Sequence, residues 1–399
     1  TLFDHHASAS DYEVFTDPEI ALNLLTFQNY FVAGGKASSR RWGDIEMANP
    51  SNPKGGPCAG KSIIYSFGRG ANLLSTMHLN MNSYEEINFV YGDGSSFIGK
   101  PVWELPIDSP INGSAIDNAT KTHLGRLVPQ TRILRVHNDR SRVLFGAGFY
   151  YPKFQDNNAF FPDLFSTVVL DKDQKRIPLG AKKDKSLWRE LHSISVRIKS
   201  RNDGSRGPLW LQNIENTACD IIASAMITNP SQAAEIVDLI ESVYILPRQL
   251  HSELGINIYE SEVRAAESIA SKLGGAVETY RLEIDGGWKA RLEMAGQSKG
   301  QLKVRLHSIA TTHYWTTAEQ HLDLLMSAIA SLGSDSFAGL QTEWRSMLHA
   351  SAREAYALAC AQDSPRQMRA FAKGWKKLTT RKDETGEVKT DKGNQEDKE

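Results

Sequence analysis

The last third of the chain is constrained most by apolar residues that recur at the spacing of an α-helix. One stripe follows positions i, i+3, i+4 and i+7, and its members are Leu322, Leu325, Met326 and Ile329. A second stripe runs through residues 337–359, and Ser364-Pro365 is typical of the start of a further helix. Helices with one apolar side bury that side against one another. We therefore predict a bundle of about four helices over residues 248–380.

The two ends of this helical region are also predicted from local sequence. Thr317 and Gln320 have the spacing of a capping box and are expected to start the helix of the first stripe. The tail, residues 381–399, is charged and carries Val388 as its one apolar side chain. A segment of that composition cannot bury a core, so we predict that the tail is disordered.

Residues 1–247 have a different pattern, with short apolar runs broken by Gly, Pro and Asn. Thr16-Asp17-Pro18-Glu19 predicts a helix that ends near Phe31. Residues 83–122 are rich in Gly, Pro and Ser and are expected to be irregular. The predicted strands are Ser62–Phe67, Arg132–Val136, Val143–Tyr150 and Ser166–Leu170. The fold class is therefore α+β, a mixed domain with irregular loops and short sheets followed by the helical bundle.

Composition excludes several classes of protein. No run of about 18 apolar residues is present, so no membrane span and no membrane partner are expected. The first residues lack the apolar region of a signal peptide, and the three cysteines are widely spaced, which favours a reducing cytoplasm. The net charge is −1, but residues 121–206 hold 18 Lys and Arg against 8 Asp and Glu. Such a local excess of cations can neutralise phosphates if it shares a face, or can be an ordinary solvated surface.

The segment Gly55–Ser62 fits the phosphate-loop motif at every position. In that motif, backbone N–H groups surround phosphates, the lysine (here Lys61) contacts the β- and γ-oxygens, and the hydroxyl of Ser62 binds Mg²⁺. The mechanism requires a strand before the loop and a helix after it. Here residues 47–54 are polar and broken by proline, and Ile63–Gly68 favours a strand. A P-loop nucleotide hydrolase is therefore the alternative function and not the preferred one.

Catalytic and metal-binding patterns are otherwise weak. Asp4, His5 and His6 are adjacent, so their side chains point to opposite sides of an extended segment and make a poor metal site. The sequence has no paired-cysteine spacing and no nucleophile–base motif. We expect no catalytic residues, no metal and no cofactor.

Three short segments suit contact with nucleic acid. Gly34-Gly35-Lys36 combines glycines that permit close backbone approach with a cation. Lys153 follows an aromatic, proline-containing turn, and Ser231-Gln232-Ala233 lies in a turn between two apolar stretches. Each segment taken alone is equally typical of an ordinary turn.

Read in order, longer segments of the chain resemble CasA, the large subunit of the type I-E CRISPR complex called Cascade. The similarity runs through nearly the whole chain, with a mixed domain ahead of a helical bundle. Its anchors are Ile20–Gln28, Gly34-Gly35, Lys54–Pro57, Phe67–Thr76, Pro101–Glu104, Lys185–His192 and Thr312–Trp315. In this family the Lys54–Pro57 stretch is a structural loop ahead of a strand and is not a nucleotide site.

The resemblance implies a function in DNA recognition without catalysis. The family reads the protospacer-adjacent motif (PAM) of double-stranded DNA from the minor groove and starts strand separation. Its glycine loop matches Gly34 and Gly35, its lysine finger matches Lys153, and its glutamine wedge matches Gln232 between Ser231 and Ala233. Its partners are guide RNA, the backbone, small and guide-end subunits of Cascade, and the CRISPR helicase-nuclease. Guide RNA pairing then reads the rest of the target.

The chain also departs from the family pattern. The family extends further before the segment that matches Thr1, and matches near residues 4–15 are poor. Ser231 stands where an Asn can occur, so the preferred PAM is left open. The position of the lysine finger depends on the alignment, and Lys172 or Lys175 is the alternative to Lys153.

Overall fold

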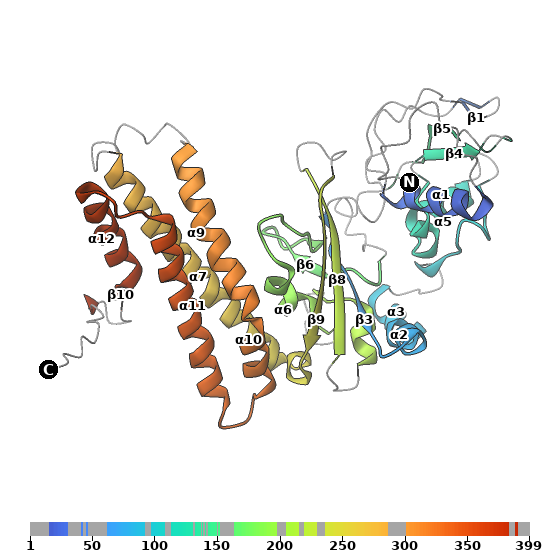
Figure 1. The fold of residues 1–399 in the computed structure, drawn as a ribbon. Helices are drawn as coiled ribbons and strands as arrows, with labels where there is room; N and C mark the ends of the chain where they lie inside the picture. Colours follow the sequence, from blue (N-terminus) through green and yellow to red (C-terminus); the bar gives the residue numbers. More distant parts are fainter. Residues whose placement is uncertain are drawn as a thin grey trace. The chain divides into compact units, whose positions relative to one another are not determined.

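The structure is a computed structural model that divides into two compact units, Thr1–Glu253 and Leu254–Glu399. Figure 1 shows the elements of each unit along the chain. The residues that the structure describes are 16–30, 41–42, 45–46, 62–91, 97–107, 113–130, 132–136, 138, 140, 143–149, 151, 163–197, 205–214, 219–229, 236–285, 301–382 and 388–389.

The first unit is organised around a three-stranded antiparallel sheet in the order β3-β8-β9. Its strands are β3 (Tyr65–Arg69), β8 (Cys219–Thr228) and β9 (Ile236–Leu246). Alternate residues of β8, including Ile221 and Ala223, are fully buried, so one face of the sheet covers a core. Two-stranded antiparallel pairs accompany this sheet: β1 (Arg41–Trp42) with β2 (Ile45–Glu46), β4 (Arg132–Val136) with β5 (Val143–Ala147), and β6 (Val168–Leu170) with β7 (Arg176–Pro178).

Close packing at one glycine joins this sheet to a helix and a tryptophan. A Cβ built on Gly68 of β3 would overlap Leu79 Cδ2 and would lie 2.8 Å from the Trp210 ring. The indole Nε1 of Trp210 donates to the carbonyl of Ser66 at 2.8 Å. Because the strand carries no side chain at Gly68, the indole can reach the backbone of β3. This packing explains why position 68 is a glycine in this chain.

The first unit also contains short helices, and several of them begin with side-chain caps. The α-helices of this unit are α1 (Asp17–Tyr30), α2 (Leu73–Asn80), α3 (Tyr84–Tyr91), α5 (Gly113–Lys121) and α6 (Leu191–Ile194), and the 3₁₀ helices are η2 (Leu124–Leu127), η3 (Leu187–Glu190), η5 (Leu209–Asn213) and η6 (Arg248–His251). The predicted first helix is confirmed, and Thr16 caps it by donating its N–H and its hydroxyl to Glu19.

The prediction that residues 83–122 are irregular was wrong, because α3 and α5 lie within them. The missed signal is a capping box at the start of α3. Ser83 N–H donates to Glu86 Oε2 at 2.9 Å, and Glu86 N–H donates to Ser83 Oγ at 3.3 Å. That reciprocal pair satisfies two backbone donors that a helix start would otherwise leave without a partner. In α5, Ala115 and Ala119 are one turn apart and are buried.

The second unit is the predicted helical bundle. Its helices are α7 (Glu253–Ile284), α9 (Gln301–Gln320), α10 (Leu322–Ala330), α11 (Phe337–Ala359) and α12 (Pro365–Thr379), and β10 (Arg381–Lys382) pairs with β11 (Val388–Lys389) after them. The buried seam includes Tyr259, Tyr314, Leu325, Trp344 and Leu348. The predicted α+β class with a C-terminal bundle is confirmed. The rest of the predicted disordered tail lies outside the described residues.

The capping box expected from Thr317 and Gln320 was wrong. Both residues lie inside α9, and the helical segment breaks one residue later, at His321. Thr317 donates its hydroxyl to the carbonyl of His313, four residues earlier, at 2.9 Å. A threonine bonded in this way is satisfied inside a helix and cannot cap the next one.

Candidate nucleic-acid interface

The residues predicted to contact DNA all lie outside the described part of the chain. They are Gly34, Gly35, Lys36, Lys153, Ser231, Gln232 and Ala233. Their assignments therefore stay predictions, and the structure describes only the elements from which those segments depart. Helix α1 ends at Tyr30, ahead of the two glycines.

The predicted glutamine wedge falls between two strands that pair with each other. Thr228 at the end of β8 is the antiparallel partner of Ile236 at the start of β9, with a β-bulge between Ile227 and Thr228. Thr228 N–H donates to Ser62 Oγ at 3.1 Å, and both residues are buried. The carbonyl of Ser62 accepts from Ala181 N–H at 2.7 Å. The base of the β8–β9 hairpin is therefore held by a hydrogen bond to Ser62, which is distant in sequence.

Ser62 is also the last residue of the phosphate-loop motif, and its surroundings do not suit nucleotide binding. Its hydroxyl is already bonded to the backbone of Thr228, and its φ is +58°. The residues that follow form a bridge at Ile63 and then strand β3. A phosphate loop needs a helix N-terminus at this point to supply N–H donors and a favourable dipole. The expected strand after the motif is confirmed, and Gly55–Lys61 lie outside the described residues.

The chain just before the predicted lysine finger is held firmly. The ring of Tyr151 is fully buried, and its hydroxyl accepts a hydrogen bond from Gln130 N–H. The Arg126 guanidinium lies 5.0 Å from the centroid of that ring. A buried aromatic ring stacked under a cation gives the chain a fixed point two residues ahead of Lys153.

The segment that follows Lys153 returns to described structure at Asp163. The Asp163 carboxylate accepts from the N–H groups of Phe165 and Ser166 at 2.8 and 2.9 Å. Arg206 is buried and donates to the carbonyls of Asp163, Ser166 and Gly207. Burial raises the pKa of the Asp163 carboxyl, while the charges of His123 and Arg206 and these two hydrogen bonds oppose that shift. This polar cluster therefore fixes the chain at Asp163, where the described structure resumes after Lys153.

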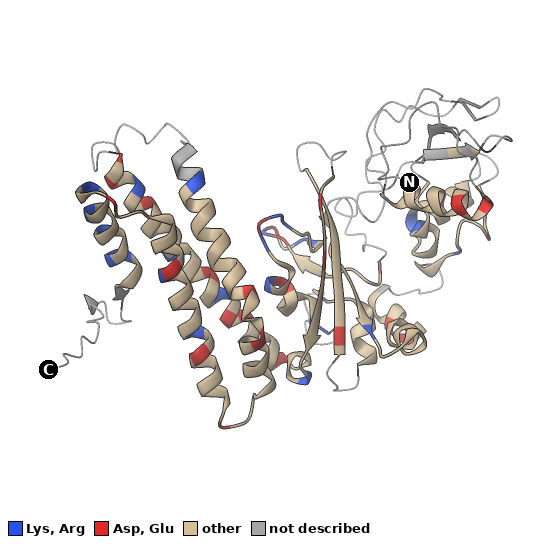
Figure 2. Cartoon of the chain, viewed as in Figure 1, with Lys and Arg blue, Asp and Glu red and all other residues tan. Residues whose placement is uncertain are grey.

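The alternative finger residues, Lys172 and Lys175, lie in the turn between β6 and β7. The Asp171 carboxylate accepts from the N–H groups of Asp173 and Lys175 at 2.9 and 2.8 Å, and Gln174 has a φ of +58°. Both lysines are exposed, and neither forms an ion pair with another described residue. Figure 2 shows Lys and Arg coloured blue along the chain beside β6. The turn therefore presents two exposed cations on a rigid support.

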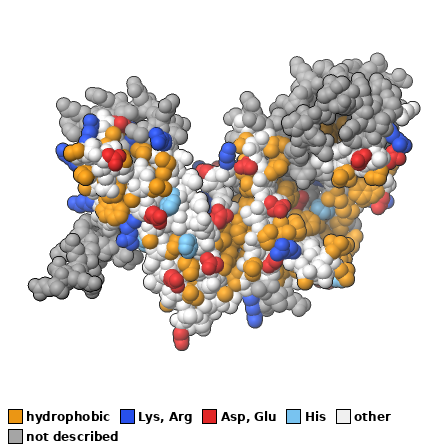
Figure 3. Space-filling model, viewed as in Figure 1, with side chains coloured by type: hydrophobic (Ala, Val, Ile, Leu, Met, Phe, Trp, Pro, Cys, Tyr) orange, Lys and Arg blue, Asp and Glu red, His pale blue; other side chains and the backbone are white. Residues whose placement is uncertain are grey.

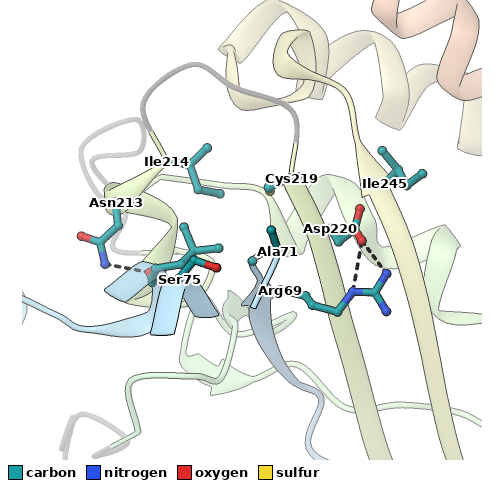
Figure 4. A pocket seen from close by; sticks show the side chains of 10 residues that line it. Arg69, Ala71, Ser75, Asn213, Ile214, Cys219, Asp220 and Ile245 are labelled. Carbon is teal, nitrogen blue, oxygen red and sulfur yellow. Dashed lines mark hydrogen bonds and ion pairs between the residues drawn. The ribbon is translucent and has the colours of Figure 1, made fainter. Parts of the chain in front are cut away.

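One pocket of about 500 Å³ lies where β3 meets α2 and the ends of β8 and β9. Figure 4 shows Arg69 and Asp220 paired on one side of it, with Ser75 and Asn213 on the other side. Arg69 Nε donates to Asp220 Oδ2 at 3.1 Å. Ser75 completes the capping box of α2 with Asn72, and Asn213 donates to the carbonyl of Leu79 at 2.9 Å. These polar groups are already used by the fold.

The thiol of this pocket is not set up as a nucleophile. Burial and then the Asp220 carboxylate raise the pKa of the Cys219 thiol to about 12. A thiol with that pKa stays protonated at neutral pH, and the thiolate is the reactive form. Within the residues that the structure describes, no group of His, Cys, Asp and Glu could hold a metal ion. None of the described helices is long and apolar enough to cross a membrane.

An apolar surface is exposed on α2 and α3. Helix α2 buries none of its residues, and Leu73 and Met77 on it are 76% and 57% exposed. Tyr84 and Phe89 of α3 are exposed as well. Figure 3 shows hydrophobic side chains gathered over this region. Exposed apolar side chains gathered on neighbouring helices are typical of a surface that contacts another molecule.

Comparison with protein families gives a match over most of the chain. The family described as CRISPR-associated protein Cse1 matches residues 1–355. No curated protein matches this sequence. The family match covers the whole first unit and the bundle through most of α11.

Solved structures share the fold at low sequence identity. CasA from Thermus thermophilus is 18% identical, and the match covers 92% of this chain and 72% of that chain with a TM-score of 0.66. Cse1 from Acidimicrobium ferrooxidans is also 18% identical, with the same coverage and a TM-score of 0.61. A chain of a CRISPR RNA-guided surveillance complex is 15% identical, and the match covers 92% of this chain and 69% of that chain with a TM-score of 0.61.

Proposed function

The chain belongs to the family of CRISPR-associated protein Cse1, and on this premise we propose that it is the large subunit of a type I-E Cascade surveillance complex. The observation that carries the proposal is the family match through residue 355, across a mixed unit and a helical bundle in the same order as in the family. The fold shared with a chain of an RNA-guided surveillance complex supports it. Guide RNA and the other Cascade subunits are then its partners, in the cytoplasm.

Within that complex, we propose that the first unit recognises the PAM and begins strand separation. Gly34 and Gly35 allow the backbone to approach the minor groove, with Lys36 beside them. Lys153 donates to the acceptors of that groove, and Lys172 or Lys175 is its alternative. Gln232, flanked by Ser231 and Ala233, enters the base stack. Unstacking costs on the order of a few kcal/mol per step, so the wedge must be held by a stiff support.

The described framework supports this assignment of roles. The hydrogen bond from Thr228 N–H to Ser62 Oγ stabilises the base of the β8–β9 hairpin. A stable base lets the hairpin keep its conformation when a side chain carried between its strands enters the base stack. The buried Tyr151 and the Asp163–Arg206 cluster hold the two ends of the segment that carries Lys153. Fixed supports at both ends of a segment reduce the entropy lost when one of its side chains enters a groove.

The apolar surface on α2 and α3 supports membership of a larger assembly. Leu73, Leu74, Met77 and Met81 are all more than half exposed. Subunits of an obligate assembly cover such a surface with a neighbour. Recruitment of the CRISPR helicase-nuclease by this subunit is a further part of the proposal, and it rests on the family resemblance alone.

We propose that the subunit has no catalytic activity. Ser62 is bonded to Thr228, a strand follows it, and the Cys219 thiol is held protonated. The alternative function, nucleotide hydrolysis at Gly55–Ser62, requires Lys61 to contact the β- and γ-phosphate oxygens. If ATP hydrolysis by the purified chain is detected and is lost in Lys61→Ala, the alternative is correct. We expect no hydrolysis in either protein.

The proposal is tested by co-expression with a guide RNA and the other Cascade subunits. We expect the chain to co-purify in one ribonucleoprotein and to confer preference for duplexes that carry a PAM. That binding should weaken with salt, because phosphate contacts release counterions. A chain that stays outside the ribonucleoprotein, or a complex that binds duplexes with and without a PAM equally, would refute the proposed function.

A further inference from the structure

Helix α12 carries an unusual density of positive charge. Its sequence, Pro365–Thr379, holds five Lys and Arg and no Asp or Glu. Arg366, Arg369, Lys373 and Lys376 are exposed and follow spacings of three, four and three residues. Residues at those spacings share one side of a helix. Figure 2 shows the cations along α12.

The opposite side of α12 is already packed within the bundle. Phe371 and Trp375 stack with ring centroids 5.5 Å apart, and Tyr356 of α11 lies 4.9 and 6.1 Å from their centroids. A Cβ built on Gly374 would overlap Tyr356 Oη and would lie 2.7 Å from the Ala276 carbonyl. This close approach leaves α12 little freedom to rotate, so its cationic side must face away from the core.

Most of these cations have no acidic partner in the described part of the chain. Lys373 pairs with Glu283 of α7 at 2.7 Å. Arg366, Arg369 and Lys376 form no ion pair with any described residue. A stripe that is fixed in place, with three of its four cations unpaired among the described residues, can bind an anion without first breaking internal pairs.

We propose that this stripe, Arg366, Arg369, Lys373 and Lys376, binds the phosphates of a nucleic-acid strand independently of the PAM. From Arg366 to Lys376 the helix rises about 15 Å. One strand of DNA places a phosphate about every 3.4 Å along the axis, so the stripe matches about four phosphates. A single row of cations suits a linear polyanion better than a compact one.

The contacts of the helix distinguish this partner from a membrane. A helix that lies on a membrane inserts its aromatic side among the lipids. In α12 the aromatic side is occupied, because Phe371 and Trp375 stack on each other and pack against Tyr356. Phosphate binding needs only the exposed side and leaves the bundle intact.

The test compares two triple variants of the full chain. Arg366→Gln/Arg369→Gln/Lys376→Gln removes the unpaired cations of the stripe. The matched control, Lys272→Gln/Arg305→Gln/Arg353→Gln, removes the same charge from exposed positions on α7, α9 and α11. Binding of an oligothymidylate without a PAM is measured at several salt concentrations. Each lost phosphate contact lowers the slope of log K against log salt by about 0.7 for a single strand.

We expect the stripe variant to lower this slope by about 2 and the control to leave it within error. If the slope of log K against log salt is the same in both variants, whether unchanged or lowered, the proposal is overturned. Capture of the chain by vesicles of anionic phospholipid, lost only in the stripe variant while the DNA slope is unchanged, would assign the helix to a membrane and also overturn it. Gln232→Ala should leave the slope unchanged, so failure here is distinguishable from failure of PAM recognition.

Discussion

The sheet of the first unit and the helices of the second unit bury comparable tryptophans in different ways. Trp210 reaches across 144 positions of sequence to donate its Nε1 hydrogen to the carbonyl of Ser66 in β3. Trp344 sits in the apolar seam of α11, among residues at helical spacing. The first unit depends on polar contacts between distant segments, whereas the second depends on apolar stripes that are local in sequence.

The difference is clearest for buried charges. Arg206 in the first unit joins Asp163, Ser166 and Gly207 through backbone carbonyls, and so ties together segments with no shared periodicity. In the bundle, Glu262 of α7 is the buried acid, and it bridges two helices through Arg345 and Gln341 of α11. The contrast teaches that the segments proposed to contact DNA start from a scaffold that single polar substitutions can loosen.

The largest expected effect is that of Arg206→Met. The change leaves three carbonyls without their donor and the Asp163 carboxylate without the nearby positive charge. We expect a loss of about 3–5 kcal/mol in the free energy of unfolding of the first unit. Hydrogen exchange of the amides of β3 and β8 measures it, and the amides of α7 report the second unit. Arg264→Met, an exposed control on α7, should cost less than about 1 kcal/mol.

A matched pair of substitutions sharpens the comparison at the tryptophans. Trp210→Phe removes the donor to the Ser66 carbonyl, while Trp344→Phe removes ring volume from the apolar seam. Beyond the shared cost of lost volume, we expect Trp210→Phe to cost about 1–3 kcal/mol more, because a buried acceptor loses its partner. Denaturant unfolding followed by hydrogen exchange gives the loss in free energy of unfolding for each of the two variants. If the two substitutions cost the same, the distinction between polar and apolar scaffolds fails.

The smallest expected effect on stability comes from two buried serines. Ser62→Ala removes the acceptor of Thr228 N–H and should destabilise the β8–β9 hairpin by about 1–3 kcal/mol. Ser351 of α11 is also buried, and its hydroxyl has no hydrogen-bond partner among the described residues. Ser351→Ala should therefore be neutral or slightly stabilising. A larger loss at Ser351 than at Ser62 would contradict the comparison.

Sequence predicted the bundle better than the mixed unit, for a physical reason. The stripes through Leu325 and Trp344 repeat at the helical period, so each helix is visible within a short window. The bonds that hold the first unit join residues that no local window contains, such as Thr228 and Ser62 at a separation of 166. Helix α3 is the exception that could have been found, since Ser83 and Glu86 have the spacing of a capping box.

The candidate site was predictable only by analogy with a family. Gly34, Lys153 and Gln232 are ordinary turn residues by composition, and nothing in their local pattern separates them from other turns. Their supports, by contrast, could not be predicted at all. The contact of Tyr151 with Gln130 and Arg126 and the contact of Ser62 with Thr228 depend on tertiary structure.

The most direct test of the central claim is strand opening by the assembled complex. A fluorescent base next to the PAM reports opening of a linear duplex, and complexes are compared with the native chain, with Gln232→Ala and with the exposed bundle control Gln362→Ala. We expect Gln232→Ala to assemble normally and to slow opening about tenfold or more, since each ~1.4 kcal/mol of lost wedge energy is tenfold. The control should open the duplex at the native rate. Opening at the native rate by Gln232→Ala would contradict the account.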